Sequence, residues 1–274
     1  QAEDGIRDVE RSRGLGDVYK RQLQTWAGSK FTRPHSILLD HEDNIWCVDD
    51  SGHKISKFNQ SLELLLTLGD GNPSERESGY PFNRPTDITI NKTNGDIFIS
   101  DGYGNSRIHH YDSEGKHIKS WGESGTQPGQ FSLPHNLCMI SSDELIVCDR
   151  ENHRVQIFST SGEFIKEWHV HKATAVTCDD EGKIYIAEQG PPPVQYGVKN
   201  LGHSVGIWNK EGDLLERIGS ELPGEEADQF LWPHSISVDS KGRIFIAEVS
   251  YVEVGRTLSP PREMTSFRVW EPLS

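Results

Sequence analysis

Residues 134–168 read PHNLCMISSDELIVCDRENHRVQIFSTSGEFIKEW, and this stretch decides the fold. It contains four short runs in which apolar and polar residues alternate, at 135–140, 145–149, 154–158 and 162–168. Alternation with a period of two residues predicts half-buried β-strands, and the residues between the runs are typical of turns. The stretch therefore predicts a unit of four consecutive strands with no helix.

The same unit recurs from Leu23 onward. Its first strand starts at Pro34, Pro85, Pro134, Ala173 and Pro233, so the unit is roughly 40–60 residues long, as in propeller blades. Four-stranded units repeated around an axis form a β-propeller. We therefore predict an all-β fold, a single β-propeller domain over residues 23–274, with about five blades present of an expected six.

The two ends of the chain depart from the repeat. Residues 1–22 mix both charge signs with glycine, and 7–22 resembles translated sequencing-adaptor read-through, so we treat 1–22 as a non-native or disordered segment. Residues 23–28 match a fourth strand without its partners, and the last unit ends after its third strand at 266–270. The lone strand either completes the last blade and closes a five-bladed ring, or remains from a sixth blade.

The bulk composition narrows the classes of partner. The chain of 274 residues has 42 acidic and 28 basic side chains and a net charge of −14, which argues against nucleic acid. No apolar run approaches the roughly 20 residues that span a bilayer. The four cysteines form no CxxC pair, and we expect free thiols, with a Cys138–Cys148 bridge as the alternative. We expect a monomer.

One position of the repeat alternates between two residue types. The residue after the first proline or alanine of each unit reads, in order, His35, Thr86, His135, Thr174 and His234. Equivalent positions on alternate blades form a triangle about the axis, and three imidazoles with an open fourth position describe a catalytic zinc site. The alternative is that these are packed or surface histidines, since the chain has 12 in all.

Two more side chains are expected at the same end of the central channel. Neighbouring strands in a blade are antiparallel, so the start of each first strand lies beside the end of the second. Tyr103 and Arg150 follow directly after the ends of two second strands. Tyr103 is a candidate base and Arg150 a candidate anion-binding group, whereas the alternatives are a core aromatic and a structural ion pair with Asp149 or Glu151. Two long loops, 189–203 and 249–265, leave from this end.

Several of these motifs resemble a known family. The stretch 151–158, ENHRVQIF, resembles the NHL repeat. A wider set is similar to the peptidyl-α-hydroxyglycine α-amidating lyases, which are six-bladed propellers with a three-histidine zinc site. That set comprises Pro34–His35, Phe82–Asp87, Ser100–Ile108, Trp121–Glu123, Pro128–His135 and Cys148–Asn152.

The resemblance implies roles for five residues. His35, His135 and His234 fall on the zinc ligands, Tyr103 on the catalytic tyrosine and Arg150 on one catalytic arginine. A second family arginine lies in a first blade that this chain lacks.

Three further positions depart from the animal enzymes. Ser235 replaces an aspartate that helps to hold a calcium ion there, which weakens the expectation of Ca²⁺. Asn83 and Gly104 replace a pair of cysteines, so the chain resembles a bacterial-type relative more closely.

These features predict a zinc-dependent lyase that cleaves a peptidyl-α-hydroxyglycine-like carbinolamide to a primary amide and glyoxylate. The substrate would be a peptide or small molecule with a C-terminal hydroxyglycine. Two alternatives remain. One is a non-catalytic NHL propeller that binds a peptide or protein partner, and the other is a metal-dependent lactonase-like hydrolase, which holds a hard cation with carboxylate and amide oxygens.

Overall fold

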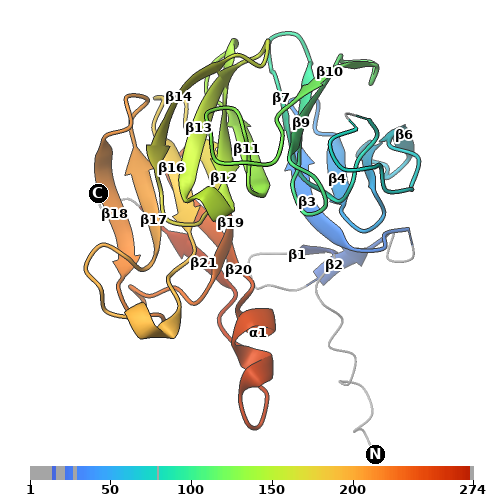
Figure 1. Ribbon diagram of the computed structural model, residues 1–274. Helices are drawn as coiled ribbons and strands as arrows, with labels where there is room; N and C mark the ends of the chain where they lie inside the picture. The colour runs from blue at the N-terminus through green and yellow to red at the C-terminus, as the bar shows by residue number, and fades with distance from the viewer. Residues whose placement is uncertain (1–13, 17–21, 27–29, 79, 272–274) are drawn as a thin grey trace, which may run out of the picture.

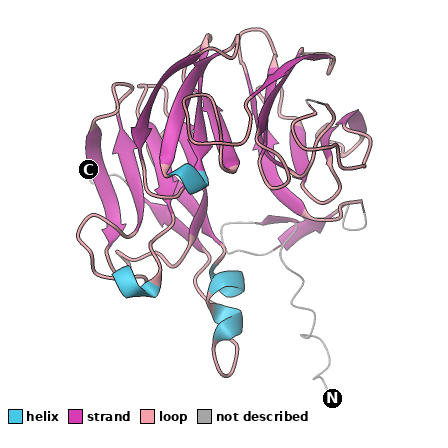
Figure 2. Cartoon of the chain, in the orientation of Figure 1, coloured by secondary structure: helices cyan, strands magenta, loops and turns pink. Residues whose placement is uncertain are grey.

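Short runs of β-branched and aromatic residues between glycine turns form the strands of five successive sheets (Figures 1 and 2). The computed structural model describes residues 14–16, 22–26, 30–78 and 80–271. Each sheet is one blade, and all its neighbouring strands are antiparallel. The predicted all-β propeller is thus confirmed.

The first two blades each have four strands. The first comprises β3 (Pro34–Leu39), β4 (Ile45–Asp49), β5 (Lys54–Phe58) and β6 (Leu64–Leu68). The second comprises β7 (Pro85–Ile90), β8 (Ile97–Asp101), β9 (Arg107–Tyr111) and β10 (His117–Trp121).

The next two blades repeat this order, and the last has three strands. The third comprises β11 (Pro134–Met139), β12 (Glu144–Asp149), β13 (Arg154–Ser159) and β14 (Phe164–His169). The fourth comprises β15 (Ala173–Cys178), β16 (Ile184–Glu188), β17 (His203–Trp208) and β18 (Leu214–Ser220). The fifth comprises β19 (Pro233–Val238), β20 (Ile244–Glu248) and β21 (Phe267–Trp270).

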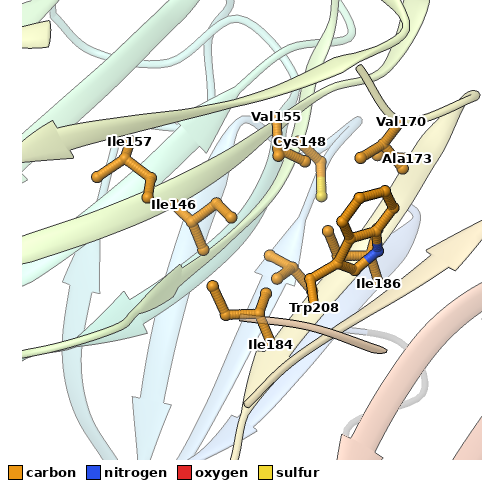
Figure 3. Close-up of a cluster of buried hydrophobic side chains, with 10 residues drawn as sticks. Ile146, Cys148, Val155, Ile157, Val170, Ala173, Ile184, Ile186 and Trp208 are labelled. Atoms are coloured by element: carbon orange, nitrogen blue, oxygen red, sulfur yellow. The ribbon is translucent and has the colours of Figure 1, made fainter. Parts of the chain in front are cut away.

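The core lies between the blades rather than inside any one of them. Figure 3 shows the cluster between the third and fourth blades, where Trp208 packs against Ile184, Ile186 and the third-blade side chains Ile146 and Cys148. Similar clusters fill the other spaces between successive blades. Because blades stack on one another, the first strands β3, β7, β11, β15 and β19 lie side by side at the centre.

The outer face of the first blade lacks such a neighbour along part of its length. Ile37 and Leu39 of β3 are 67% and 65% exposed, whereas Ile88, in the place of Ile37 one blade on, is 2% exposed. Phe267 and Val269 of β21 are also exposed on the last blade. The apolar faces that blades bury elsewhere are thus open here.

The N-terminal strand does not complete the last blade. β2 (Gln22–Thr25) pairs with β1 (Gly14–Gly16) in a separate two-stranded sheet, not with β21. The account in which this strand closes a five-bladed ring is therefore wrong. β1 lies within the segment 1–22 that the sequence set apart from the fold, and most of that segment is outside the described residues. The sixth blade and the non-native origin of the segment stay predictions.

The 3₁₀ turn η1 (Arg150–Asn152) follows β12, and the other short helices lie in the two long loops. The 3₁₀ turn η2 (Pro193–Gln195) lies in the loop 189–203, and α1 (Ser250–Glu253) and η3 (Gly255–Thr257) lie in the loop 249–265. Figure 1 shows α1 on a segment that projects beyond the ends of the strands. No helix among the described residues has the length and apolar character needed to cross a membrane. All four cysteines are free, as expected.

Candidate metal centre and active site

Loops that precede the first strands are fixed by acids at the ends of the second strands. Asp49 accepts hydrogen bonds from the backbone N–H groups of Thr32 and Arg33, at 2.8 and 2.7 Å. In the last blade, Glu248 accepts one from the N–H of Trp232 at 2.8 Å. These donors lie two or three residues before His35 or His234. Each acid therefore fixes the point at which that histidine enters the central channel.

The structure brings the three predicted ligands together. His35, His135 and His234 lie on β3, β11 and β19, and their ring centroids are 5.1, 5.2 and 4.8 Å apart. One ligand atom of each ring lies within 4.8 Å of the others. Among the described residues, no other three or more His, Cys, Asp or Glu side chains gather closely enough to hold a metal ion.

Two of these rings are fixed in one tautomer. Nδ1 of His35 lies 2.6 Å from the carbonyl oxygen of Thr86, and Nδ1 of His135 lies 2.5 Å from that of Thr174. A carbonyl oxygen only accepts, so both Nδ1 atoms carry the proton. The Nε2 lone pairs of both rings are therefore available to a cation.

The surroundings keep the imidazoles neutral. Burial lowers the pKa of His35, lowers that of His234 to about 3, and lowers that of His135 well below its ordinary value. The neighbouring Arg150 acts in the same direction on all three. Metal ligation requires neutral imidazoles, and three of them suit a borderline cation such as zinc. The donor set thus fits the predicted metal.

Tyr103 lies beside two of the three histidines. Its hydroxyl is 2.9 Å from Nε2 of His35 and 3.1 Å from Nε2 of His135. Burial raises the pKa of Tyr103, while Arg150 and Arg33 pull it down. Burial has the larger effect, so the pKa of Tyr103 is raised overall.

The glycines beside Tyr103 pack closely against neighbouring segments. Gly102 is buried and lies against the next blade. A Cβ on Gly102 would lie 2.1 Å from the carbonyl oxygen of Pro134, and one on Gly104 would lie 2.2 Å from Oδ1 of Asn83. These positions need glycine for close packing, which holds Tyr103 against the centre.

Three guanidinium groups surround the Tyr103 ring. The guanidinium carbons of Arg84, Arg33 and Arg150 lie 5.0, 5.6 and 6.0 Å from the ring centroid. Arg150 also donates from Nε to Glu151 at 2.8 Å, so the structural pairing weighed against a catalytic role is present as well. On a chain of net charge −14, this end of the channel is locally cationic.

Sequence reasoning missed Arg33 and Arg84. Both share the buried carboxylate of Asp50, at 2.8 and 3.4 Å. The signal was nevertheless present, because each stands directly before the proline that opens its unit, at Pro34 and Pro85. The equivalent residues of the third and fifth blades are Leu133 and Trp232, and that of the fourth is Lys172, so cations at this position occur in three of the five blades.

Comparisons with known proteins identify an NHL repeat and relatives that are named as amidating enzymes. The NHL repeat model matches residues 82–111 and 131–158. The chain is 37% identical over 269 residues to "Peptidylglycine alpha-amidating monooxygenase" of Rattus norvegicus, covering 88% of this chain and 26% of that protein. It is 31% identical over 270 residues to "Peptidyl-alpha-hydroxyglycine alpha-amidating lyase 1" of Drosophila melanogaster, covering 88% of this chain and 48% of that protein.

The alignments cover only part of each relative. The chain spans less than a third of the amphibian and rodent relatives and about half of the fly protein. Among solved structures, a streptogramin B lyase superposes with a TM-score of 0.60 at 15% identity, covering 94% of this chain and 75% of that one. Similarity at that level supports the propeller fold alone.

Proposed function

We propose that this chain, an NHL-repeat β-propeller related to the peptidyl-α-hydroxyglycine α-amidating lyases, cleaves a C-terminal α-hydroxyglycine or a similar N-acyl carbinolamide. The products are a primary amide and glyoxylate. The observation that carries the proposal is the cluster of His35, His135 and His234, with the hydroxyl of Tyr103 within hydrogen-bond reach of Nε2 of the first two.

The three histidines are the residues that would hold the cation, and we propose zinc. When bound, such an ion supplies a Lewis acid for the carbinol oxygen and a positive charge that favours ionised oxygen groups nearby. Calcium is not part of the proposal, since Ser235 offers no carboxylate where the animal enzymes have one.

The reaction moves one proton within the substrate. The carbinol O–H bond breaks, its electron pair forms the C=O bond of glyoxylate, and the C–N bond breaks with a proton added to nitrogen. Tyr103 is placed to take the hydroxyl proton and return it to the amide nitrogen. For this the phenol must ionise, and the guanidinium groups of Arg150 and Arg33 favour that form against the effect of burial.

The arginines supply recognition. A substrate of this class ends in a carboxylate, and the leaving glyoxylate is also an anion. Arg150, Arg84 and Arg33 gather at the Tyr103 ring, and the planar fork of a guanidinium suits bidentate binding of a carboxylate. We propose that Arg150 contacts the substrate carboxylate and that Arg84 and Arg33 strengthen the local positive field.

A glyoxylate assay tests the proposal. Purified protein loaded with zinc is incubated with α-hydroxyhippurate, and glyoxylate is measured alongside His135→Ala and His41→Ala variants. His41 is an exposed histidine away from the triangle, so its variant is a matched control. Turnover by the wild type and His41→Ala but not His135→Ala supports the lyase. No turnover by the zinc-loaded wild type refutes it and favours the binding scaffold; turnover of a lactone with calcium favours the hydrolase.

A further inference from the structure

We propose that Thr86 and Thr174 are positioning residues. Each lies on a blade between two blades that carry metal ligands, and each orients both of those ligands. The inference rests on the metal site of the proposed function and extends it to residues that touch neither metal nor substrate. Thr86 and Thr174 occupy, on β7 and β15, the place that histidine occupies on the other three first strands.

The backbone of each threonine orients the preceding ligand. The carbonyl oxygen of Thr86 accepts the Nδ1 proton of His35 at 2.6 Å, and that of Thr174 accepts the Nδ1 proton of His135 at 2.5 Å. The hydrogen bond on one ring nitrogen decides which nitrogen faces a metal and how the ring is turned. These carbonyls therefore direct Nε2 of both rings into the triangle.

The side chain of each threonine fixes the following ligand. Oγ1 of Thr86 lies 2.9 Å from the carbonyl oxygen of Pro134, and Oγ1 of Thr174 lies 3.1 Å from that of Pro233. Those prolines directly precede His135 and His234. Each threonine hydroxyl therefore contacts the next blade at the residue directly before a metal ligand.

Each hydroxyl has one proton, which it shares between that proline carbonyl and a carbonyl on the second strand of its own blade. Oγ1 of Thr86 lies 3.1 Å from the carbonyl oxygen of Ser100, and Oγ1 of Thr174 lies 3.0 Å from that of Ala187. Both threonines are fully buried, so water has no access to replace a lost hydroxyl. Each threonine therefore ties together three points: the ring of one ligand, the backbone before the next, and the second strand of its own blade.

This arrangement explains why the second residue of the first strand alternates between histidine and threonine from blade to blade. The site needs a ligand on every second blade, and the blade between has to present a carbonyl to one side and a short hydroxyl to the other. Valine has nearly the shape of threonine and lacks the hydroxyl, whereas serine keeps it. The pair of substitutions therefore separates the hydrogen bond from the packing.

Zinc affinity measured by competition with a chelator, without substrate, tests the proposal. Thr86→Val and Thr174→Val are each expected to weaken zinc binding roughly 10- to 100-fold, as other losses of ligand-orienting groups do, while Thr86→Ser stays within roughly threefold of the wild type. Thr89→Val is the matched control. Thr89 lies three residues further along the same strand, and its Oγ1 accepts a hydrogen bond across the blades from the N–H of Met139 at 3.4 Å, four residues after His135. Its zinc affinity should not change.

A second measurement needs no variant. In ¹⁵N-histidine NMR spectra of the metal-free wild type, His35 and His135 are expected to carry the proton on Nδ1. Protonated Nε2 at both rings would overturn the proposal, even if the valine variants failed to fold.

The outcomes separate the two proposals. Unchanged zinc affinity in both valine variants overturns the role of the threonine hydroxyls, and protonated Nε2 at both rings overturns the role of the carbonyls; either result leaves the lyase intact. If the wild type binds zinc, Thr86→Val binds it more weakly as expected, and no glyoxylate forms, the lyase is overturned and the positioning role remains. A wild-type chain that binds no zinc overturns both.

Discussion

Replacement of Tyr103 by phenylalanine removes a single hydroxyl that contacts two of the three clustered histidines. That hydroxyl has one proton and two acceptors, Nε2 of His35 at 2.9 Å and Nε2 of His135 at 3.1 Å, so it makes one full hydrogen bond at a time. In the metal-free chain the loss should lower the free energy of unfolding by about 1 kcal/mol. The two imidazole lone pairs then no longer have a competitor, and zinc should bind equally well or up to about fivefold more tightly.

Turnover should respond very differently. If Tyr103 takes the carbinol proton, its loss should lower kcat roughly 10²- to 10⁴-fold, the usual contribution of a general base. The assay follows glyoxylate from α-hydroxyhippurate, and chelator competition gives the zinc affinity of the same samples. Tyr185→Phe is the matched control, because the Tyr185 hydroxyl also donates a hydrogen bond, to Asp179 at 2.9 Å, outside the site.

Two results would refute this reasoning. Full kcat in Tyr103→Phe would exclude the phenol as the base. A loss of zinc from that variant would show that Tyr103 helps to hold the metal, and the lower turnover would then have a different cause.

Three further substitutions test the packing and electrostatics around the site. Gly102→Ala should weaken zinc binding and cost about 1–3 kcal/mol of stability, since its Cβ would lie 2.1 Å from the carbonyl oxygen of Pro134; a chelator titration and a thermal melt that match the wild type would contradict this. Ile88→Ala should lower the free energy of unfolding by about 2–5 kcal/mol and Ile37→Ala by less than about 0.5 kcal/mol, because their side chains are 2% and 67% exposed; equal costs in urea unfolding would disprove the difference. Burial lowers the pKa of His203 to about 4, so the unfolded chain binds a proton below about pH 6.5 that the folded chain does not; stability should fall by up to about 3 kcal/mol from pH 6.5 to 4, and a His203→Gln variant with the same pH slope would rule this out.

The strands were predictable because their signal is local. Alternation predicted strands at 145–149 and 154–158, and the structure has strands over Glu144–Asp149 and Arg154–Ser159, within one residue of these bounds. The repeat also put His35, His135 and His234 in equivalent positions of their units. Three histidines far apart in the sequence were therefore expected near one axis.

The remaining features depend on distances between blades, which no local pattern contains. The hydroxyl of Tyr103 reaches two histidines from different blades, and Arg33 and Arg84 share Asp50 across a blade boundary. The pairing of β2 with β1 likewise depends on which partner is nearby, and not on the sequence of β2. Such contacts follow only once the blades are stacked.

Metal content of the purified chain bears most directly on the convergence of the three imidazoles. After equilibration with zinc and removal of the free ion, elemental analysis should give one zinc per chain in the wild type and in His41→Ala, and none above background in His135→Ala. A wild type without bound zinc, or a His135→Ala variant that retains as much as the wild type, would contradict the site and the chemistry proposed from it.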